Sequence, residues 1–430
     1  MKMEIDEVGG WLRERLPELA EEHGVPGAAV AVGAGERVVE EAAGVLSTAT
    51  GVEATVDSVF QIGSVTKVLT ATLVMGLVAE GLVELDAPVA SYLPGFRKAT
   101  VRQLLCHTAG FEGDVFTDTG KGDDCLERYV ELLADVPQFF EPGEMFSYNN
   151  AGYSVLGRIV EVVRGEPFDR CMRDHLFTPL GMTHAASDPY EAILHRAAVG
   201  HTSGGPVPVW AMARSNAPAG SMLAMTPRDL LAFARAHLAD ERLRAMREPQ
   251  VVLPDIGWGT AWGLGWEIYD LPGGPVFGHN GNTIGQSAVL RVDPDRDVSV
   301  AIFTNGGDRK PLMKEILGRV VESPAEPVPN PAQRPDVRRC AGVYLSSTSE
   351  TTVSGDEHGR LWLERVPLGL AVEAGDEPHR TELLGWRGDS LLPAEPGHGP
   401  VAFLGDDGDG RARYLHTGRA DVRAAGRIEN

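Results

Sequence analysis

Lysine is scarce in this chain: it occurs at six of 430 positions, while lysine and arginine together occupy 39. Acidic residues number 61, so the formal net charge is -22 at pH 7. Such a negative field opposes binding to nucleic acid and to anionic membranes, and we expect neither as a partner. Arginine supplies most of the cations, and its guanidinium stays protonated. A lysine such as Lys67 therefore indicates a site that needs an amine able to lose its proton.

Cysteine is also rare, and its pattern excludes a disulfide framework or a cysteine-based metal site. The four residues show neither paired nor metal-like spacing, so we expect reduced, partly buried thiols. They are Cys106, Cys125, Cys171 and Cys340. The histidines form no zinc signature such as His-Glu-x-x-His, and we expect neither a metal nor a cofactor.

Long apolar runs are absent as well, and no stretch is long enough to span a bilayer. The segment Met3-Glu4-Ile5-Asp6-Glu7 is acidic, and the basic region followed by an apolar core that is typical of a secretory signal is missing. These absences predict a cytoplasmic location and a substrate that is found inside the cell.

The segment Gly63-Ser64-Val65-Thr66-Lys67 opens an apolar stretch that ends near Gly81, which predicts a helix. Residues three apart share a helix face, so the Lys67 amine can reach the Ser64 hydroxyl. A serine hydroxyl becomes a good nucleophile when a base takes its proton, and a buried lysine can be that base. On these residues alone, a core helix with Lys67 extended to solvent at its edge is an equal alternative.

A second pattern, Tyr148-Asn149-Asn150, precedes a predicted helix over residues 151–163. We expect Tyr148 on a turn, where a lysine ammonium drives its phenol toward phenolate and makes it a general acid or base. The Asn150 amide can hold both a substrate carbonyl and Lys67. The alternative is an asparagine-rich turn in which Tyr148 only packs against the helix.

A third pattern, His279-Asn280-Gly281, lies in a glycine-rich segment before two predicted strands, 287–292 and 298–304. Glycine at such a place lets a ligand approach the backbone of an edge strand. His416-Thr417-Gly418 has the same pattern. We favour His279, because residue 416 belongs to a separate small segment beyond a proline-rich linker.

In this order, Ser64-x-x-Lys67, Tyr148-x-Asn150 and His279-x-Gly281 resemble the three motifs of the class C β-lactamase superfamily. That superfamily includes DD-peptidases, D-aminopeptidases, esterases and natural-product transacylases. The resemblance covers roughly residues 8 to 322. Most true β-lactamases have Lys-Thr-Gly as the third motif, so the sequence looks more like the esterase, peptidase and transacylase branches.

The resemblance implies an acyl-enzyme mechanism and a role for each motif residue. Ser64, Lys67 and Tyr148 are catalytic, Asn150, His279 and Gly281 contact the substrate, and the backbone N–H groups of Ser64 and Asn282 form the oxyanion hole. His279 is expected at the rim of the cleft, beside an acceptor or a substrate carboxylate.

The resemblance also implies an α+β fold: a β-lactamase/transpeptidase-like domain with a central antiparallel sheet, flanking helices and an all-helical lobe. We expect this catalytic domain over residues 1–322, a proline-rich linker over 323–339 and a small antiparallel β-barrel over 340–430. Short strand-like runs separated by Asp and Gly clusters predict the barrel, which resembles the lipocalin-like domain of several relatives. The predicted runs are 342–345, 361–365, 371–373, 401–404 and 413–416.

We therefore expect a serine enzyme that hydrolyses or transfers the acyl group of an intracellular small-molecule ester, amide or thioester, with water, an amine or an alcohol as acceptor. An esterase or transacylase is favoured. Open alternatives are a stand-alone peptide cyclase or thioesterase, a D-stereospecific peptidase and a β-lactamase. The alternative from another class is a penicillin-binding sensor without turnover, and the presence of every motif residue argues against it.

Overall fold

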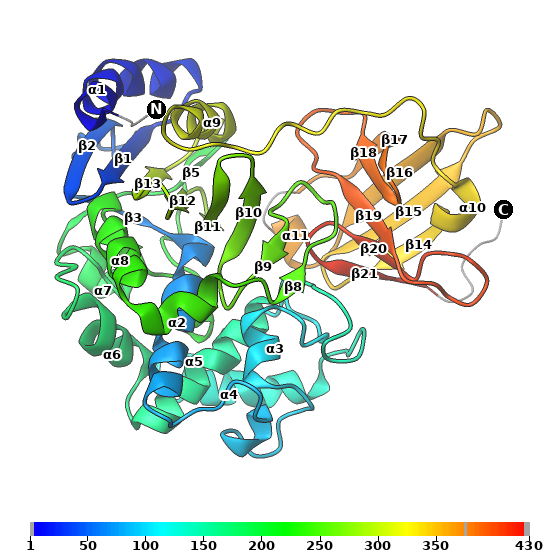
Figure 1. The fold of residues 1–430 in the computed structure, drawn as a ribbon, viewed down its shortest axis with the longest axis horizontal. Helices are drawn as coiled ribbons and strands as arrows, with labels where there is room; N and C mark the ends of the chain where they lie inside the picture. Colours follow the sequence, from blue (N-terminus) through cyan, green and yellow to red (C-terminus); the bar gives the residue numbers. More distant parts are fainter. Residues whose placement is uncertain (1–3, 374–375, 425–430) are drawn as a thin grey trace.

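The computed structural model describes residues 4–373 and 376–424, so positions 1–3, 374–375 and 425–430 of the predicted domains lie outside the described residues. Figure 1 shows a large sheet with helices around it, a helical lobe beside it and a separate barrel. The predicted α+β fold class is confirmed, because the main sheet is antiparallel and the second body is a closed barrel of eight strands.

The main sheet has eight strands, and every neighbouring pair is antiparallel. Their order is β2 (Arg37–Gly44), β1 (Gly27–Ala34), β13 (Val298–Thr304), β12 (Ser287–Asp293), β11 (Gly274–Asn282), β10 (Glu267–Leu271), β9 (Ala261–Trp262) and β8 (Val251–Val252). Strand β1 pairs with β13 from Ala28 opposite Thr304 to Ala34 opposite Val298. This pairing joins a strand near the start of the catalytic domain to one near its end.

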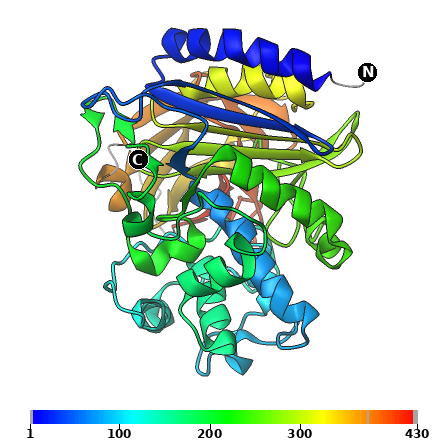
Figure 2. The same cartoon turned by 90° about the vertical axis from the view of Figure 1, so that its left-hand side faces the viewer.

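Helices cover both faces of this sheet (Figure 2). Helices α1 (Ile5–Glu22) and α9 (Arg309–Val320) pack on one face. Helices α2 (Thr66–Ala79) and α8 (Pro227–Ala239) pack on the other. Helix α1 buries Val8, Leu12, Leu16 and Leu19, a spacing that places apolar side chains on a single helical stripe.

The helical lobe lies beyond α2 (Figure 2). Its elements are α3 (Val101–Leu105), α4 (Cys125–Leu132), α5 (Asn150–Arg164) and α6 (Phe168–Met172), followed by α7 (Pro189–Ala192). Short strands β3 (Ser58–Gln61), β4 (Arg196–Ala197) and β7 (Ala224–Met225) form a small sheet, and β5 (His201–Thr202) pairs with β6 (Gly205–Pro206). Asn149 caps α5, since its side chain accepts a hydrogen bond from the Gly152 N–H at 2.6 Å.

The barrel closes because β14 pairs with β21 as well as with β15. Its strands are β14 (Gly342–Leu345), β15 (Ser349–Gly355), β16 (Leu361–Pro367), β17 (His379–Arg387), β18 (Ser390–Pro393), β19 (Val401–Leu404), β20 (Tyr414–His416) and β21 (Ala420–Arg423). Helix α10 (Val337–Cys340) precedes it. The run 371–373, predicted as a strand, lies instead in a short helix, α11 (Leu370–Glu373). The domain limits at residues 322 and 340 stay predictions.

All four cysteines are free and buried. Across the described ranges, no helix combines the length and the apolar character that crossing a membrane requires.

Candidate active site

Ser64 and Lys67 lie where the chain leaves β3 and enters α2 through a tight helical turn, Gly63–Val65. The Lys67 Nζ atom donates to Ser64 Oγ at 3.1 Å and to the carbonyl oxygen of Ala219 at 2.6 Å. Lys67 is fully buried, whereas Ser64 is only half-buried. The predicted contact between hydroxyl and amine is present, and the alternative with Lys67 at the edge of the helix is wrong.

The electrostatics around Lys67 favour the neutral amine. Burial lowers its pKa well below the usual 10.5, and the positive charge of Arg419 lowers it further, while Asp114 acts in the opposite direction. Desolvation penalises the ammonium, so the proton is held weakly. A neutral Lys67 within hydrogen-bond range of Ser64 is therefore equipped to accept the hydroxyl proton.

Strand β11 lies directly against the nucleophile turn. A Cβ atom added at Gly281 would overlap the carbonyl oxygen of Ile62 and stand 3.0 Å from the backbone nitrogen of Ser64. A Cβ added at Gly63, whose φ is +51°, would stand 2.5 Å from the backbone nitrogen of Asn282. These close approaches place the Asn282 backbone beside that of Ser64, and they need glycine at both positions.

Tyr148 is buried beside Lys67, with Nζ 4.9 Å from the centre of the phenol ring. Burial raises the pKa of the phenol well above its usual 10.0, and this effect outweighs the opposing hydrogen bond with Ser64. The predicted shift toward phenolate is thus reversed, because desolvation penalises the charged phenolate. A neutral Tyr148 can donate a proton but cannot begin the reaction as the base.

Asn150 begins α5, but its amide nitrogen donates to Asp114 Oδ1 at 2.7 Å. The expected contact with Lys67 is replaced by the Ala219 carbonyl. Asp114 also forms an ion pair with Arg419, whose Nη2 lies 3.2 Å from Asp114 Oδ1. Asn150 is therefore hydrogen-bonded to Asp114, which belongs to an ion pair with Arg419 that the sequence did not predict.

His279 is buried on β11, so it does not lie at an exposed rim as expected. Its ring centre is 5.4 Å from that of Trp262 and 6.3 Å from that of Tyr148. Burial lowers its pKa to about 3. His279 is thus a neutral imidazole behind Tyr148 at ordinary pH, which removes the predicted charge pairing with a carboxylate.

The barrel contributes to this site, which the sequence did not predict. Arg419 follows β20, and its guanidinium lies 5.1 Å from the centre of the Tyr148 ring. The side chain is 38% exposed, so it is open to solvent on one side. No local motif identifies Arg419 or Asp114, because the docking of the barrel is what brings them to the motif residues. His416 lies on strand β20 of the barrel, and its Nε2 is 2.8 Å from the carbonyl oxygen of Phe146 in the catalytic domain.

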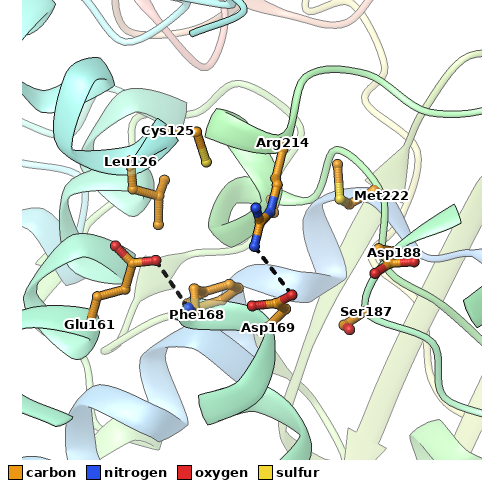
Figure 3. A pocket seen from close by; sticks show the side chains of 10 residues that line it. Cys125, Leu126, Glu161, Phe168, Asp169, Ser187, Asp188, Arg214 and Met222 are labelled. Carbon is orange, nitrogen blue, oxygen red and sulfur yellow. Dashed lines mark hydrogen bonds and ion pairs between the residues drawn. The ribbon is translucent and has the colours of Figure 1, made fainter. Parts of the chain in front are cut away.

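A separate hollow in the helical lobe is lined by charged and apolar side chains (Figure 3). Arg214 lies 3.3 Å from Asp169, and Glu161 accepts a hydrogen bond from the Phe168 N–H at 3.0 Å. Its polar groups thus bind one another, and none of the predicted catalytic residues lines it. Its residues are Cys125, Leu126, Glu161, Phe168, Asp169, Ser187, Asp188, Arg214, Ala217 and Met222.

The fold and the motif geometry define a β-lactamase-fold serine hydrolase, and comparison with known proteins agrees. The chain belongs to the beta-lactamase family, whose model matches residues 12–323. It is 44% identical to penicillin-binding protein 4 of Amycolatopsis lactamdurans over 367 residues, which is 77% of this chain and 96% of that protein. It is 32% identical to the esterase EstB of Burkholderia gladioli over 197 residues, or 41% of this chain and 50% of that one.

Among solved structures, SurE matches with a TM-score of 0.82 and 31% identity, covering 98% of this chain and all of SurE (100%). A second SurE structure, determined with D-Leu, has a TM-score of 0.79 over 97% of this chain and 99% of that one. The match therefore includes the barrel as well as the hydrolase domain.

Proposed function

We propose that the protein forms a covalent acyl-enzyme at Ser64 and hydrolyses or transfers the acyl group of a small-molecule ester, amide or thioester. The fully buried Lys67 amine, 3.1 Å from the Ser64 hydroxyl, carries this proposal. Because burial favours the neutral amine, Lys67 can act as the base without help from another ionised group.

Acylation follows from this arrangement. Ser64 Oγ attacks the carbonyl carbon, and its proton passes to Lys67 Nζ. The backbone N–H groups of Ser64 and Asn282 donate to the oxyanion, and one such donor is worth about 3 to 4 kcal/mol of the barrier. The Tyr148 phenol gives its proton to the leaving atom as that bond breaks, and the Lys67 ammonium then reprotonates Tyr148.

Deacylation uses the same groups in reverse. Water, an amine or an alcohol attacks the acyl carbon and loses its proton to Lys67. Ser64 Oγ leaves and recovers that proton from Lys67, which restores the starting state. Lys67 and Tyr148 exchange a proton during acylation, so their titrations are coupled.

We favour a substrate that contains a D-amino acid. The support is the likeness to SurE, which has been solved with D-Leu and aligns with both bodies of this chain. The match to an esterase supports an activated carbonyl as the acyl donor. Nucleic acid stays excluded in this proposal, because the net charge of -22 opposes it.

The test uses matched pairs of small activated esters. The purified chain is mixed with the p-nitrophenyl esters of N-acetyl-D-leucine and N-acetyl-L-leucine, and release of nitrophenol is followed while intact mass detects the adduct. We expect a mass increase of one acyl group, located on Ser64 and absent from Ser64→Ala, and faster acylation by the D-ester. Adding an amine then divides the acyl-enzyme between hydrolysis and transfer.

Three results would contradict the proposal at different levels. Absence of an adduct with both esters and with a fluorescent penicillin would remove the acyl-enzyme itself. A stable adduct that never turns over would support the sensor alternative. Equal acylation by the two esters would leave the acyl-enzyme in place and remove the preference for D-amino acids.

A further inference from the structure

The turn between β20 and β21 lies against the segment that carries Tyr148. The Tyr148 N–H donates to the carbonyl oxygen of Gly418 at 2.9 Å. The Ala420 N–H donates to the Ser147 hydroxyl at 3.1 Å. Together with Arg419 beside the Tyr148 ring, these bonds attach the backbone of the Tyr148 segment to the barrel.

His416 is at the centre of this attachment. It is fully buried, and its Nε2 lies 2.8 Å from the carbonyl oxygen of Phe146, two residues before Tyr148. Its Nδ1 accepts from the Gly418 N–H at 3.2 Å. A carbonyl oxygen only accepts, so the proton must be on Nε2. The neutral His416 ring thus links the Phe146 carbonyl to the 417–419 turn. The Gly418 carbonyl in that turn accepts from the Tyr148 N–H.

The turn itself has little freedom to adopt another shape. Gly418 has a φ of +105°, and a Cβ atom added there would stand 2.5 Å from the Trp258 ring. The Trp258 ring in turn packs edge-on against Tyr148, with ring centres 5.7 Å apart. The turn therefore moves as one rigid unit, and a displacement that begins at His416 reaches Tyr148 through the Gly418 carbonyl that accepts from its N–H.

We propose that His416 is a positioning residue for the proposed acylation: by holding the 417–419 turn against Phe146, it fixes the place of the Tyr148 phenol relative to Ser64. The inference rests on the proposed function, since it assigns His416 to the reaction of that same site. His416 does not touch the reacting atoms and acts through the backbone of residues 146–148.

The consequence for rate comes from the proximity of Tyr148 to the catalytic pair. Its ring centre lies 4.9 Å from Lys67 Nζ, and its hydroxyl interacts with Ser64. Displacing a catalytic group by about 1 Å costs on the order of 10²-fold in rate. Loss of the His416 bonds should therefore slow acylation of Ser64 without removing the nucleophile or the base.

The test compares three variants of the full chain. His416→Phe retains a ring but loses both hydrogen bonds. His416→Gln retains a donor that can reach the Phe146 carbonyl and an acceptor for the Gly418 N–H. The matched control is Tyr414→Phe, which removes another bond across the same interface, from the Tyr414 hydroxyl to the Phe139 carbonyl at 3.3 Å. Tyr414 is on the same strand as His416 but bonds a residue well before Tyr148.

Acylation of Ser64 by p-nitrophenyl butyrate is measured under single-turnover conditions, with the melting temperature of each variant. We expect His416→Phe to acylate 10- to 100-fold more slowly, His416→Gln to recover to within a few-fold of the parent, and Tyr414→Phe to stay within twofold. The loss should appear in the acylation rate constant and not in ester affinity.

The pH profile separates positioning from simple destabilisation. A displaced Tyr148 admits water to Lys67, which eases desolvation and raises the pKa of the amine. The acid limb of the acylation profile should therefore move to higher pH in His416→Phe. The titratable and charged groups around Lys67 are His107, His279, Asp114 and Arg419. Arg419 belongs to the displaced turn, and moving its positive charge away from Lys67 raises the pKa of the amine in the same direction. A variant that is merely less stable keeps the original limb.

The outcomes distinguish this inference from the proposed function. If His416→Phe acylates as fast as the parent, or if Tyr414→Phe slows acylation equally, His416 is not a positioning residue. If the parent forms no adduct at all, the proposed function fails. Hydrogen exchange of the Tyr148 amide then still reports on its bond to the Gly418 carbonyl. We expect faster exchange in His416→Phe, and unchanged exchange would overturn the inference. Should His416→Phe not fold, His416→Asn replaces it, since the shorter amide cannot bridge both partners.

Discussion

Replacing Gly281 with alanine tests the central geometric feature of the site, the direct contact between β11 and the nucleophile turn. The new Cβ atom would overlap the Ile62 carbonyl oxygen and stand 3.0 Å from the Ser64 nitrogen. Contacts this short do not persist between packed atoms, so either β11 or the Ser64 turn must move. Relieving the overlap requires a displacement on the order of 1 Å, which corresponds to about 10²-fold in rate when a reacting group is misplaced.

The matched control is Gly76→Ala in α2, the helix that carries Lys67. A Cβ atom at Gly76 meets no other atom within 4 Å. Alanine is more favourable than glycine in the interior of a helix. The free energy of unfolding of the Gly76→Ala control should therefore rise by about 0.5 to 1 kcal/mol, with unchanged activity. Single-turnover acylation of Ser64 by p-nitrophenyl butyrate and thermal unfolding are measured on both variants. Acylation of Gly281→Ala at the parental rate, with a parental melting temperature, would refute the close approach of β11 to Ser64.

Three further substitutions test the groups around Ser64. Lys67→Arg should reduce acylation by about 10³-fold or more, because guanidinium stays protonated, and acylation at the parental rate would contradict the role of Lys67 as base. In the parent, acylation should rise with pH through the lowered pKa of Lys67 and level off above it, and a rate that falls as pH rises would contradict this role. Tyr148→Phe should lower kcat while leaving the melting temperature nearly unchanged, whereas a large loss of stability with normal kcat would favour a packing role. His279→Ala should slow acylation by small and large esters by the same factor, since the buried ring supports Tyr148; a loss confined to large substrates would return His279 to a substrate contact.

Much of the fold could be predicted because its strands and helices follow simple periodic patterns. Strands β12 and β13 of the main sheet, and β14 and β19 of the barrel, lie at or within one residue of the predicted runs. Strand β17 was missed because its buried residues Thr381, Leu383 and Gly385 alternate with Glu382, Leu384 and Trp386, so apolar and polar residues do not alternate along it. The run 371–373 was too short to distinguish a strand from the helix that it forms.

The site divides in the same way between local and distant features. The contact between Ser64 and Lys67 follows from helix geometry, so their spacing of three residues was sufficient to predict it. The neutral state of Tyr148 could not be predicted, because it depends on how completely the phenol is buried by Trp258 and Trp262. Arg419 depends on a contact between two bodies of the fold, and no pattern near it in the chain reports that contact.

The contribution of the barrel turn sets the order in which the site can be assembled during synthesis. Domains tend to fold as units in the order in which they leave the ribosome. Ser64 and Lys67 emerge long before Arg419 and the turn at Gly418 that holds the Tyr148 amide. A nascent hydrolase domain therefore has its nucleophile and base before it has the partner of Asp114 and the bond that holds Tyr148. The contacts between the barrel turn and the Tyr148 segment are therefore the last part of the site to form.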